Sequence, residues 1–534
     1  MRNRILIKIA CRKELILLCL FLMVFSLIGH KNGMVTNKYF SENNIEKLFK
    51  NYRLFSADFS GFTKATISLR EEADTDHGWE TFYYLLPLFI FLKMLGGLNL
   101  QNLYFFNLAI GIINLILFYR ICEKYFNKQA AIIGGLFLTF SSWFFEFTMS
   151  ISYHFASITV ALILIYLMFE CATNQKMVNF FFLGAATALS LYYYGPIRFI
   201  FPAVAIVLFN VENYSSKRLV YFLSGLMPIL ILYFILSRSF IIELFDAENI
   251  FKTYPGEYNL PWFLRLRDNL NAFLSALSGG HIIKEHACLM HKLLSLPLAT
   301  GIIYALKKSR DRRYRLLLFT SAAILILPVL TTMVHTTPRR FVFYIIPVYM
   351  LIGIGGSWIV KAVSSVKRKN LRFALWLLIA SLSICIIGDE FGYTTQRLWF
   401  KKQSPDFVYL AMIISELPAE QPLYYLRETP HELFEDDSES WLLMLAIRNK
   451  KGDTEVKQIV NLDSLDFADG AYIIKSPLIS RNTFEDLTKK RGLYYKELLS
   501  VPVGKNYCSE EGCLQYKDHA LRVYIIKNGG MAAG

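Results

Sequence analysis

Residues 341–372 read FVFYIIPVYMLIGIGGSWIVKAVSSVKRKNLR, an apolar run followed directly by a basic segment. A helix needs about 20 apolar residues to cross a bilayer, so residues 341–360 are long enough to span a membrane. The segment that follows holds five basic side chains, Lys361, Lys367, Arg368, Lys369 and Arg372. Basic residues are retained on the cytoplasmic side of membrane proteins, so this stretch indicates both a span and its direction.

Apolar runs of similar length recur along the chain. They occupy about 15–28, 82–98, 102–119, 130–146, 152–170, 177–194, 196–210, 219–237, 290–306, 316–334 and 371–388. The composition agrees, because 54% of the residues are hydrophobic and only 19% are charged. A soluble chain is nearer one quarter charged. The sequence therefore excludes a soluble enzyme, a disordered chain and a fibrous protein, and it predicts a polytopic membrane protein.

The basic loops decide how many of these runs cross the membrane. Besides the loop at 361–372, basic residues gather at 120–128, at 217–218 and at 307–315, always between alternate pairs of runs. If residues 82–98 crossed, all four loops would lie opposite the basic N-terminal segment. We therefore predict that 82–98 lies at the outer surface, which leaves about eleven spans with a cytoplasmic N-terminus and an outer C-terminus. The net charge of +15 follows from this topology and implies no nucleic acid.

Three polar segments fall outside the membrane in this topology: the loops 31–81 and 238–289, and the tail 389–534. The tail has strand-like runs at 423–426, 456–460, 471–474 and 521–526 and helical patterns at 406–416, 440–448 and 483–491. The predicted fold class is thus a mainly α membrane domain over residues 1–388, followed by a small extracytoplasmic α/β domain over 389–534. Cys508 and Cys513 lie close together in that tail and are expected to form a disulfide.

Candidate functional residues gather at the predicted outer ends of the spans. Asp58, in the first outer loop, could act as a general base, although a helix N-cap explains it equally well. Three arginines lie at the predicted outer ends of spans: Arg198, Arg339 and Arg340. They could bind a phosphate bidentately through their guanidinium groups, or they could anchor the helices to ordinary lipid headgroups. Glu146 and His154 flank a short outer joint, and Tyr194 could stack on a sugar or belong to an aromatic belt. The group His281, Glu285, His286 and His291 lacks the spacing of a helical zinc site, so no metal site is predicted.

Several short patterns occur in the order typical of one enzyme class. Asp58, Phe62 and Ala65 match a pattern in that family's first outer loop, although Phe59 stands where a second acid is common. Further matches are loose: residues 77–87 followed by Leu95-Gly-Gly97, then Tyr194-Gly-Pro-Ile-Arg198, and Arg339-Arg340-Phe followed by Ile346-Pro347. Over residues 1–360 the chain resembles the GT-C glycosyltransferases, in particular the bacterial branch with protein O-mannosyltransferases and lipid A aminoarabinose transferases.

The resemblance implies an activity. A sugar would be moved from a polyprenyl-phosphate donor to an acceptor hydroxyl at the outer face of a bacterial cytoplasmic membrane, with inversion. Asp58 would be the base, and Arg198, Arg339 and Arg340 would hold the donor phosphate; His154, Tyr194 and Glu146 would contact substrate. The expected partners are this lipid-linked sugar, a glycan, lipid or protein acceptor, and membrane lipids. No cofactor is expected, and the need for a divalent metal is left open.

Three other readings of the sequence stay open: a transporter or flippase for a lipid-linked sugar, an O-antigen polymerase or ligase, and a non-catalytic protein that keeps the GT-C fold. A transporter usually has broken helices around a midplane site. Here the notable polar residues fall at the predicted outer face, which favours surface chemistry.

Overall fold

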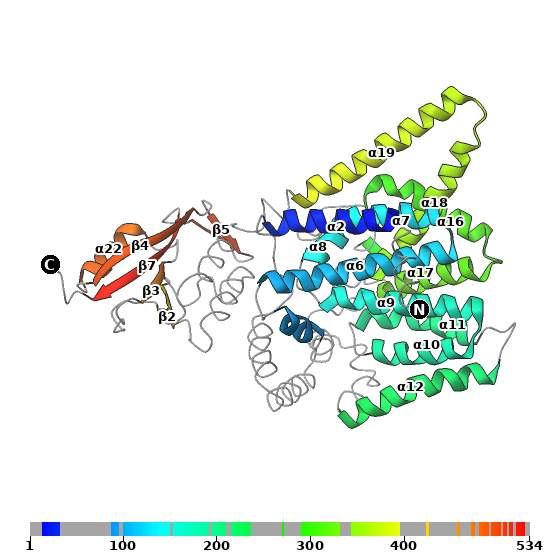
Figure 1. Ribbon diagram of the computed structural model, residues 1–534, viewed down its shortest axis with the longest axis horizontal. Helices are drawn as coiled ribbons and strands as arrows, with labels where there is room; N and C mark the ends of the chain where they lie inside the picture. Colours follow the sequence, from blue (N-terminus) through cyan, green and yellow to red (C-terminus); the bar gives the residue numbers. More distant parts are fainter. Residues whose placement is uncertain are drawn as a thin grey trace. The chain divides into compact units, whose positions relative to one another are not determined.

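The structure is a computed structural model of the 534-residue chain. It describes residues 13–31, 87–95, 100–149, 153–191, 195–209, 215–236, 267, 270–271, 290–331 and 343–395, and, in the C-terminal part, 423–426, 457–459, 471–475, 480–490, 493–502, 506–509, 512–515 and 520–528 (Figure 1). The chain divides into two compact units, of which the first holds most of the helices and the second holds the C-terminal sheet.

The helices of the first unit coincide with the predicted apolar runs. They are α2 (Lys13–Lys31), α6 (Leu100–Tyr125), α7 (Lys128–Phe140), α8 (Ser142–Met149), α9 (Tyr153–Asn174), α10 (Met177–Ser190), η1 (Gly195–Ile200), α11 (Phe201–Leu208), α12 (Ser216–Leu236), η3 (Lys292–Leu294), α16 (Ser295–Lys307), α17 (Arg312–Thr331), α18 (Ile345–Ser364) and α19 (Lys369–Thr395). The prediction of a polytopic, mainly α chain is therefore confirmed.

Among the described residues, four helical segments are long and apolar enough to cross a membrane: Phe105–Tyr125, Ala156–Asn174, Ile345–Ser364 and Lys369–Gly392. Lys128–Phe140, Met177–Ser190 and Ile197–Leu208 are shorter apolar helices. Within the run 82–98, the described part is helical over residues 87–94. The number of crossings and the surface position of 82–98 stay predictions.

The predicted span at 130–146 is wrong in one respect, because it is not a single helix. The chain leaves α7 at Ser141, whose backbone is extended (φ −60°, ψ 125°). The Ser141 hydroxyl then accepts a hydrogen bond from the Phe144 N–H at 3.5 Å, at the start of α8. Serine is a favoured N-cap because its oxygen satisfies an unpaired N–H of the first helical turn. One polar residue inside an apolar run thus divides it into two helices.

Glycines bring neighbouring helices into close contact at the α10–α12, α16–α18 and α7–α18 crossings. Between α10 and α12, a Cβ on Gly184 would lie 2.0 Å from the Phe222 carbonyl oxygen, and one on Gly225 would lie 2.0 Å from that of Phe181. Between α16 and α18, a Cβ on Gly355 would lie 1.9 Å from the Pro297 oxygen. Small residues let helix backbones approach in this way, which is how helices associate in a membrane where the lipid tails are as apolar as the side chains.

The second unit contains a five-stranded mixed sheet in the order β2-β1-β3-β7-β4 and a two-stranded hairpin of β5 and β6. The strands are β1 (Leu423–Leu426), β2 (Lys457–Ile459), β3 (Tyr472–Lys475), β4 (Leu493–Pro502), β5 (Asn506–Ser509), β6 (Gly512–Gln515) and β7 (Ala520–Asn528). β1 pairs in parallel with β2 and β3, and β7 pairs antiparallel with β3 and β4. Strands β1, β2, β3 and β7 lie where the sequence predicted strands, whereas β4, β5 and β6 were not predicted.

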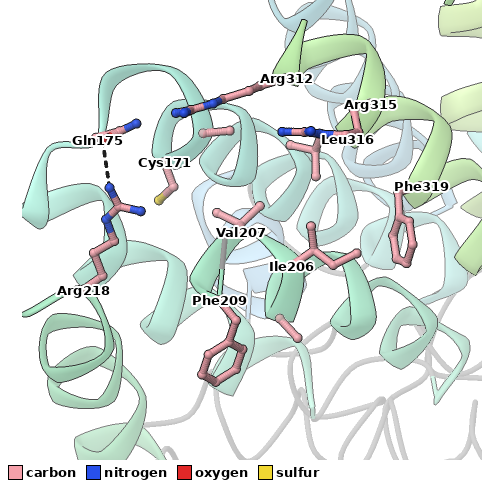
Figure 2. Close-up of a pocket in the computed structure, with 12 residues that line it drawn as sticks. Cys171, Gln175, Ile206, Val207, Phe209, Arg218, Arg312, Arg315, Leu316 and Phe319 are labelled. Carbon is pink, nitrogen blue, oxygen red and sulfur yellow. Dashed lines mark hydrogen bonds between the residues drawn. The ribbon is translucent and has the colours of Figure 1, made fainter. Parts of the chain in front are cut away.

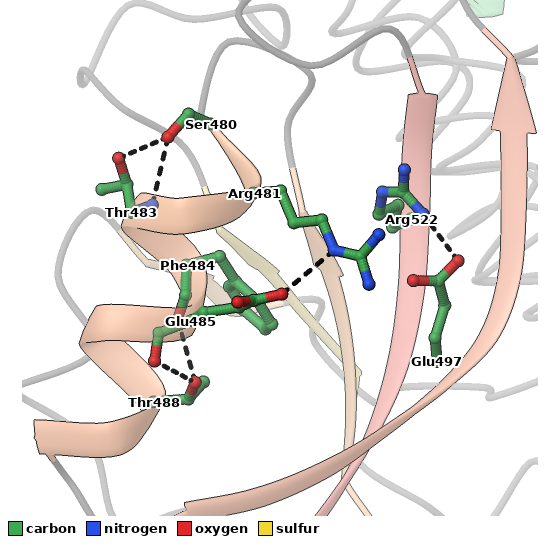
Figure 3. Close-up of polar contacts among 8 residues, drawn as sticks. All are labelled: Ser480, Arg481, Thr483, Phe484, Glu485, Thr488, Glu497 and Arg522. Atoms are coloured by element: carbon green, nitrogen blue, oxygen red, sulfur yellow. Dashed lines mark hydrogen bonds and ion pairs between the residues drawn. The ribbon is translucent and has the colours of Figure 1, made fainter.

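The helix α22 (Arg481–Lys490) packs on this sheet through Phe484 (Figure 3). The Phe484 ring is stacked on Tyr524 of β7 at 4.4 Å and meets Tyr495 of β4 edge-on at 5.3 Å. Ser480 caps the helix by accepting the Thr483 N–H at 3.1 Å. The aromatic cluster and the cap together fix where this helix lies on the sheet.

Candidate functional site

Basic side chains gather at one end of the helical unit, as hydrogen bonds between its elements establish. Arg313, just inside α17, donates to the Tyr125 carbonyl oxygen at the end of α6 at 3.0 Å. Lys128, at the start of α7, pairs with Glu14 of α2 at 2.8 Å. Arg218 of α12 donates to the Gln175 side chain, between α9 and α10, at 2.8 Å. We call this end of the helices the basic end. We call the opposite end, where the candidate site residues were predicted, the charge-poor end.

Arg198 lies at the charge-poor end. The helix α10 leaves the basic end next to Gln175 and runs for 14 residues, which is about 21 Å. At its far side the Arg198 Nη2 donates to the carbonyl oxygen of Leu191 at 3.4 Å. The side chain is half-buried and belongs to the 3₁₀ segment η1, which packs against α9 and α17. Its guanidinium is therefore held close to the end of α10.

The structure gives only backbone positions for two further candidates. His154 lies in the first turn of α9 and Glu146 lies in α8. Both belong to the charge-poor end, because α9 finishes beside Gln175 and α8 follows the far end of α7. The remaining candidates lie outside the described residues: Asp58, Tyr194, Arg339 and Arg340.

One carboxylate at the charge-poor end was not among the predicted site residues. Glu390, near the end of α19, is only 7% exposed, and its Oε2 accepts the backbone N–H of Ser142 at 2.9 Å. Ser142 is the first residue of α8, so the carboxylate meets the positive end of that helix. Glu390 thereby fixes the direction in which α8, with Glu146, continues from α7.

A histidine and an aspartate adjoin this contact. The Nε2 atom of His291 lies 3.4 Å from the Asp389 carboxylate, and its Nδ1 atom accepts the Leu293 N–H at 3.2 Å. Because Nδ1 accepts, the proton of the neutral ring must lie on Nε2, where it faces Asp389. The end of α19 thus meets both the α7–α8 corner and the entry to α16. No group of His, Cys, Asp and Glu able to hold a metal occurs among the described residues, and His281, Glu285 and His286 lie outside them.

A sequence signal for Glu390 existed, since Asp389 and Glu390 directly follow the last apolar run. The importance of the acid depends on a contact with a residue 248 positions away, and periodicity along the chain carries no information about such a contact.

Comparison with known proteins gives one family match. The model of the dolichyl-phosphate-mannose-protein mannosyltransferase family matches residues 81–237. That segment contains Arg198, Glu146 and His154. No curated protein matches the sequence.

Solved structures extend the likeness to nearly the whole chain. ArnT from Cupriavidus metallidurans bound to undecaprenyl phosphate superposes with a TM-score of 0.52 at 12% identity, over 97% of this chain and 99% of that one. The apo state of the same protein superposes with a TM-score of 0.51 at 12% identity, over 98% of this chain and 100% of that one. A weaker likeness, with a TM-score of 0.42 at 12% identity over 93% and 74%, is to the oligosaccharyltransferase AglB of Archaeoglobus fulgidus. The predicted resemblance is confirmed at the level of the fold: the chain has the fold of the ArnT structures, which is the GT-C fold of membrane glycosyltransferases, and its residues 81–237 resemble the mannosyltransferase family.

Proposed function

We propose that the chain transfers a sugar from a polyprenyl-phosphate donor to an acceptor hydroxyl at the outer face of the bacterial cytoplasmic membrane. The observation that carries the proposal is the placement of Arg198 on a GT-C fold, half-buried at the charge-poor end of the helices. A solved structure that shares this fold along its length holds undecaprenyl phosphate. An arginine fork is suited to the phosphate of such a lipid.

In the proposed reaction, Asp58 takes the proton of the acceptor hydroxyl. The acceptor oxygen attacks the anomeric carbon from the face opposite the phosphate, the bond from that carbon to the phosphate oxygen breaks, and the sugar is inverted. Arg198, Arg339 and Arg340 stabilise the charge that develops on the departing polyprenyl phosphate. A preorganised donor to a developing charge contributes about 3 kcal/mol where this has been measured.

The other residues of the charge-poor end have supporting roles in this proposal. His154, Tyr194 and Glu146 contact the sugar or the acceptor. Glu390 acts as a positioning residue, since its bond to Ser142 sets the direction of α8. The N-terminus is cytoplasmic, and residues 389–534 form an outer domain.

Purified protein with a polyprenyl-phosphate sugar and an acceptor extract tests the proposal. Asp58→Asn should lower the rate of transfer by about 10² to 10⁴, the usual contribution of a general base. Glu71→Gln, which removes an acid from the same loop, is the matched control and should leave the rate unchanged. Undiminished transfer by Asp58→Asn would remove Asp58 from the mechanism. Movement of the lipid-linked sugar across vesicles without transfer would support a flippase instead.

A further inference from the structure

A cavity of about 510 Å³ lies at the basic end of the helices, away from the proposed donor site (Figure 2). Its walls come from the end of α9, from α11, from the start of α12 and from the first turns of α17. Three arginines line it, Arg218, Arg312 and Arg315, and most of the other lining side chains are apolar. The volume is in the range of sites that hold small molecules.

Arg218 is fixed in place on one side of the cavity. It is 6% exposed, its Nη2 donates to the Gln175 Oε1 at 2.8 Å, and its guanidinium lies 5.5 Å from the centre of the Phe180 ring. Gln175 has a φ of 51°, a left-handed conformation that costs energy for any residue except glycine. The strained turn between α9 and α10 thus presents a side-chain oxygen that orients a buried guanidinium.

Arg312 and Arg315 enter from α17, three residues apart on one helix face (Figure 2). They stand in the first turn of the helix or just after it, where the helix dipole disfavours cations, and that first turn holds no acid. Retention of positive charge in the cytoplasm explains a basic loop before α17. It does not explain why the side chains of Arg312 and Arg315 line the same hollow as Arg218 of α12.

Among the described residues, two acids close to this cavity in the sequence have partners that do not line it. Asp311 is bound by Arg313, which lies 2.5 Å from its Oδ2 and holds the pKa of that carboxyl below its ordinary value. Glu170 is bound by Lys124 and Tyr125. Among the described residues that line the cavity, none is acidic. The described lining therefore presents three guanidiniums and no carboxylate.

The other side of the cavity is apolar and open. Ile206 and Phe209, at the end of α11, are 38% and 52% exposed, and Phe319 of α17 is 42% exposed. All three line the cavity. A ligand that matched the whole surface would carry a phosphate for the arginines and a hydrocarbon chain for these three side chains.

We propose that this cavity binds the headgroup of an acidic phospholipid, with the phosphodiester between Arg218, Arg312 and Arg315 and the acyl chains over Ile206, Phe209 and Phe319. Basic pockets between membrane helices on the cytoplasmic side are suited to such headgroups. The site is separate from the proposed donor site and does not depend on sugar transfer.

Native mass spectrometry of the purified full chain tests the proposal with phosphatidylglycerol, with phosphatidylcholine and with inorganic phosphate. Wild type should retain phosphatidylglycerol in preference to phosphatidylcholine. The double variant Arg312→Gln/Arg315→Gln should bind phosphatidylglycerol at least tenfold more weakly, because two charge-assisted contacts are lost. The matched control is Lys308→Gln/Arg310→Gln, which removes two exposed charges from the adjoining loop and should bind as wild type does.

A further double variant, Arg312→Lys/Arg315→Lys, keeps the charges but loses the forks, and its binding should fall between that of wild type and that of the glutamine variant. Equal binding of phosphatidylglycerol by wild type, the glutamine variant and the lysine variant would overturn the proposal. Equal retention of phosphatidylglycerol and phosphatidylcholine by wild type would also overturn it. Displacement of phosphatidylglycerol by inorganic phosphate would refute the lipid as the ligand and identify a soluble phosphate instead. An elution volume on size exclusion equal to that of wild type establishes that each variant is folded.

Discussion

A single methyl group added at the α16–α18 crossing should destabilise the helical unit. In Gly355→Ala, the new Cβ would lie 1.9 Å from the Pro297 oxygen and 2.5 Å from the Gly301 nitrogen, both backbone atoms. An ordinary contact needs about 3.4 Å or more, so the gap to the Pro297 oxygen would have to widen by roughly 1.5 Å. Overpacking of this kind costs about 1–3 kcal/mol, and the upper end applies because backbone cannot move aside as a side chain can.

The chain supplies a matched control in α19. A Cβ added at Gly388 meets nothing within 4 Å. Gly388→Ala should therefore show only the gain in helix propensity, about 0.5–1 kcal/mol. Since Gly355→Ala has the same gain, its net cost should be about 2 kcal/mol, and the two variants should differ by about 3 kcal/mol.

Thermal unfolding with a thiol-reactive fluorogenic dye measures this difference. Cys122 is buried at 0% exposure and Cys171 at 2%, so their thiols become reactive as the helices separate, and this signal adds to that of the exposed Cys385. Unfolding of a large membrane protein is often irreversible, so the apparent Tm values are compared at one scan rate. Gly355→Ala should melt several degrees below wild type and Gly388→Ala at or slightly above it. If both variants melt at or above wild type, the helices do not approach as closely at Gly355 as we describe.

Three further predictions concern the candidate site and the C-terminal unit. Arg198→Lys keeps the charge but loses the fork, so sugar transfer should fall at least tenfold with an unchanged apparent Tm; full activity would exclude Arg198 as the phosphate ligand. Glu390→Gln leaves an oxygen that can accept the Ser142 N–H, whereas Glu390→Ala leaves that N–H without its partner. The alanine variant should therefore be less stable than the glutamine variant by about 1–3 kcal/mol. Equal melting temperatures of the two variants would contradict the positioning role of Glu390. Cys508 and Cys513 are opposite each other in the β5–β6 hairpin, and this placement suits a disulfide. In protein exported to the outer face, the two cysteines should therefore react with maleimide only after reduction. Labelling of these cysteines without a reductant would contradict the disulfide.

Apolar run length predicted where the helices lie, because the backbone of a membrane segment must satisfy its own hydrogen bonds and helices do so locally. It did not predict where the helices end. The run 371–388 stops at the last apolar residue, but α19 continues to Thr395, since its polar end is held by the contacts of Asp389 and Glu390. Likewise the apolar run at 130–146 gave no sign of the break at Ser141.

The missed strand β4 has a similar explanation. It carries Lys496 and Glu497, and charged residues are disfavoured in a central strand. The structure places β4 at the edge of the sheet, where such charges are common, with Glu497 paired to Arg522 of β7 at 2.6 Å. The position of a strand within its sheet depends on pairings between distant residues, and the local pattern does not contain them.

Within the candidate site, Arg198 could be anticipated because a charge interrupts an apolar stretch. Glu390 and the cavity lined by Arg218, Arg312 and Arg315 could not, because each combines side chains from segments far apart in the sequence.

Mass analysis of cell-envelope glycans, lipids and glycoproteins, from cells with the gene and cells without it, tests the central claim most directly. A glycosyltransferase of the proposed kind predicts the loss of one sugar mass from one class of molecule when the gene is absent, with return of that mass on expression of wild type but not of Asp58→Asn. The mass identifies the sugar, and the molecule that loses it identifies the acceptor. Identical envelope profiles with and without the gene, under conditions in which the protein is made, would contradict the claim that this chain transfers a sugar.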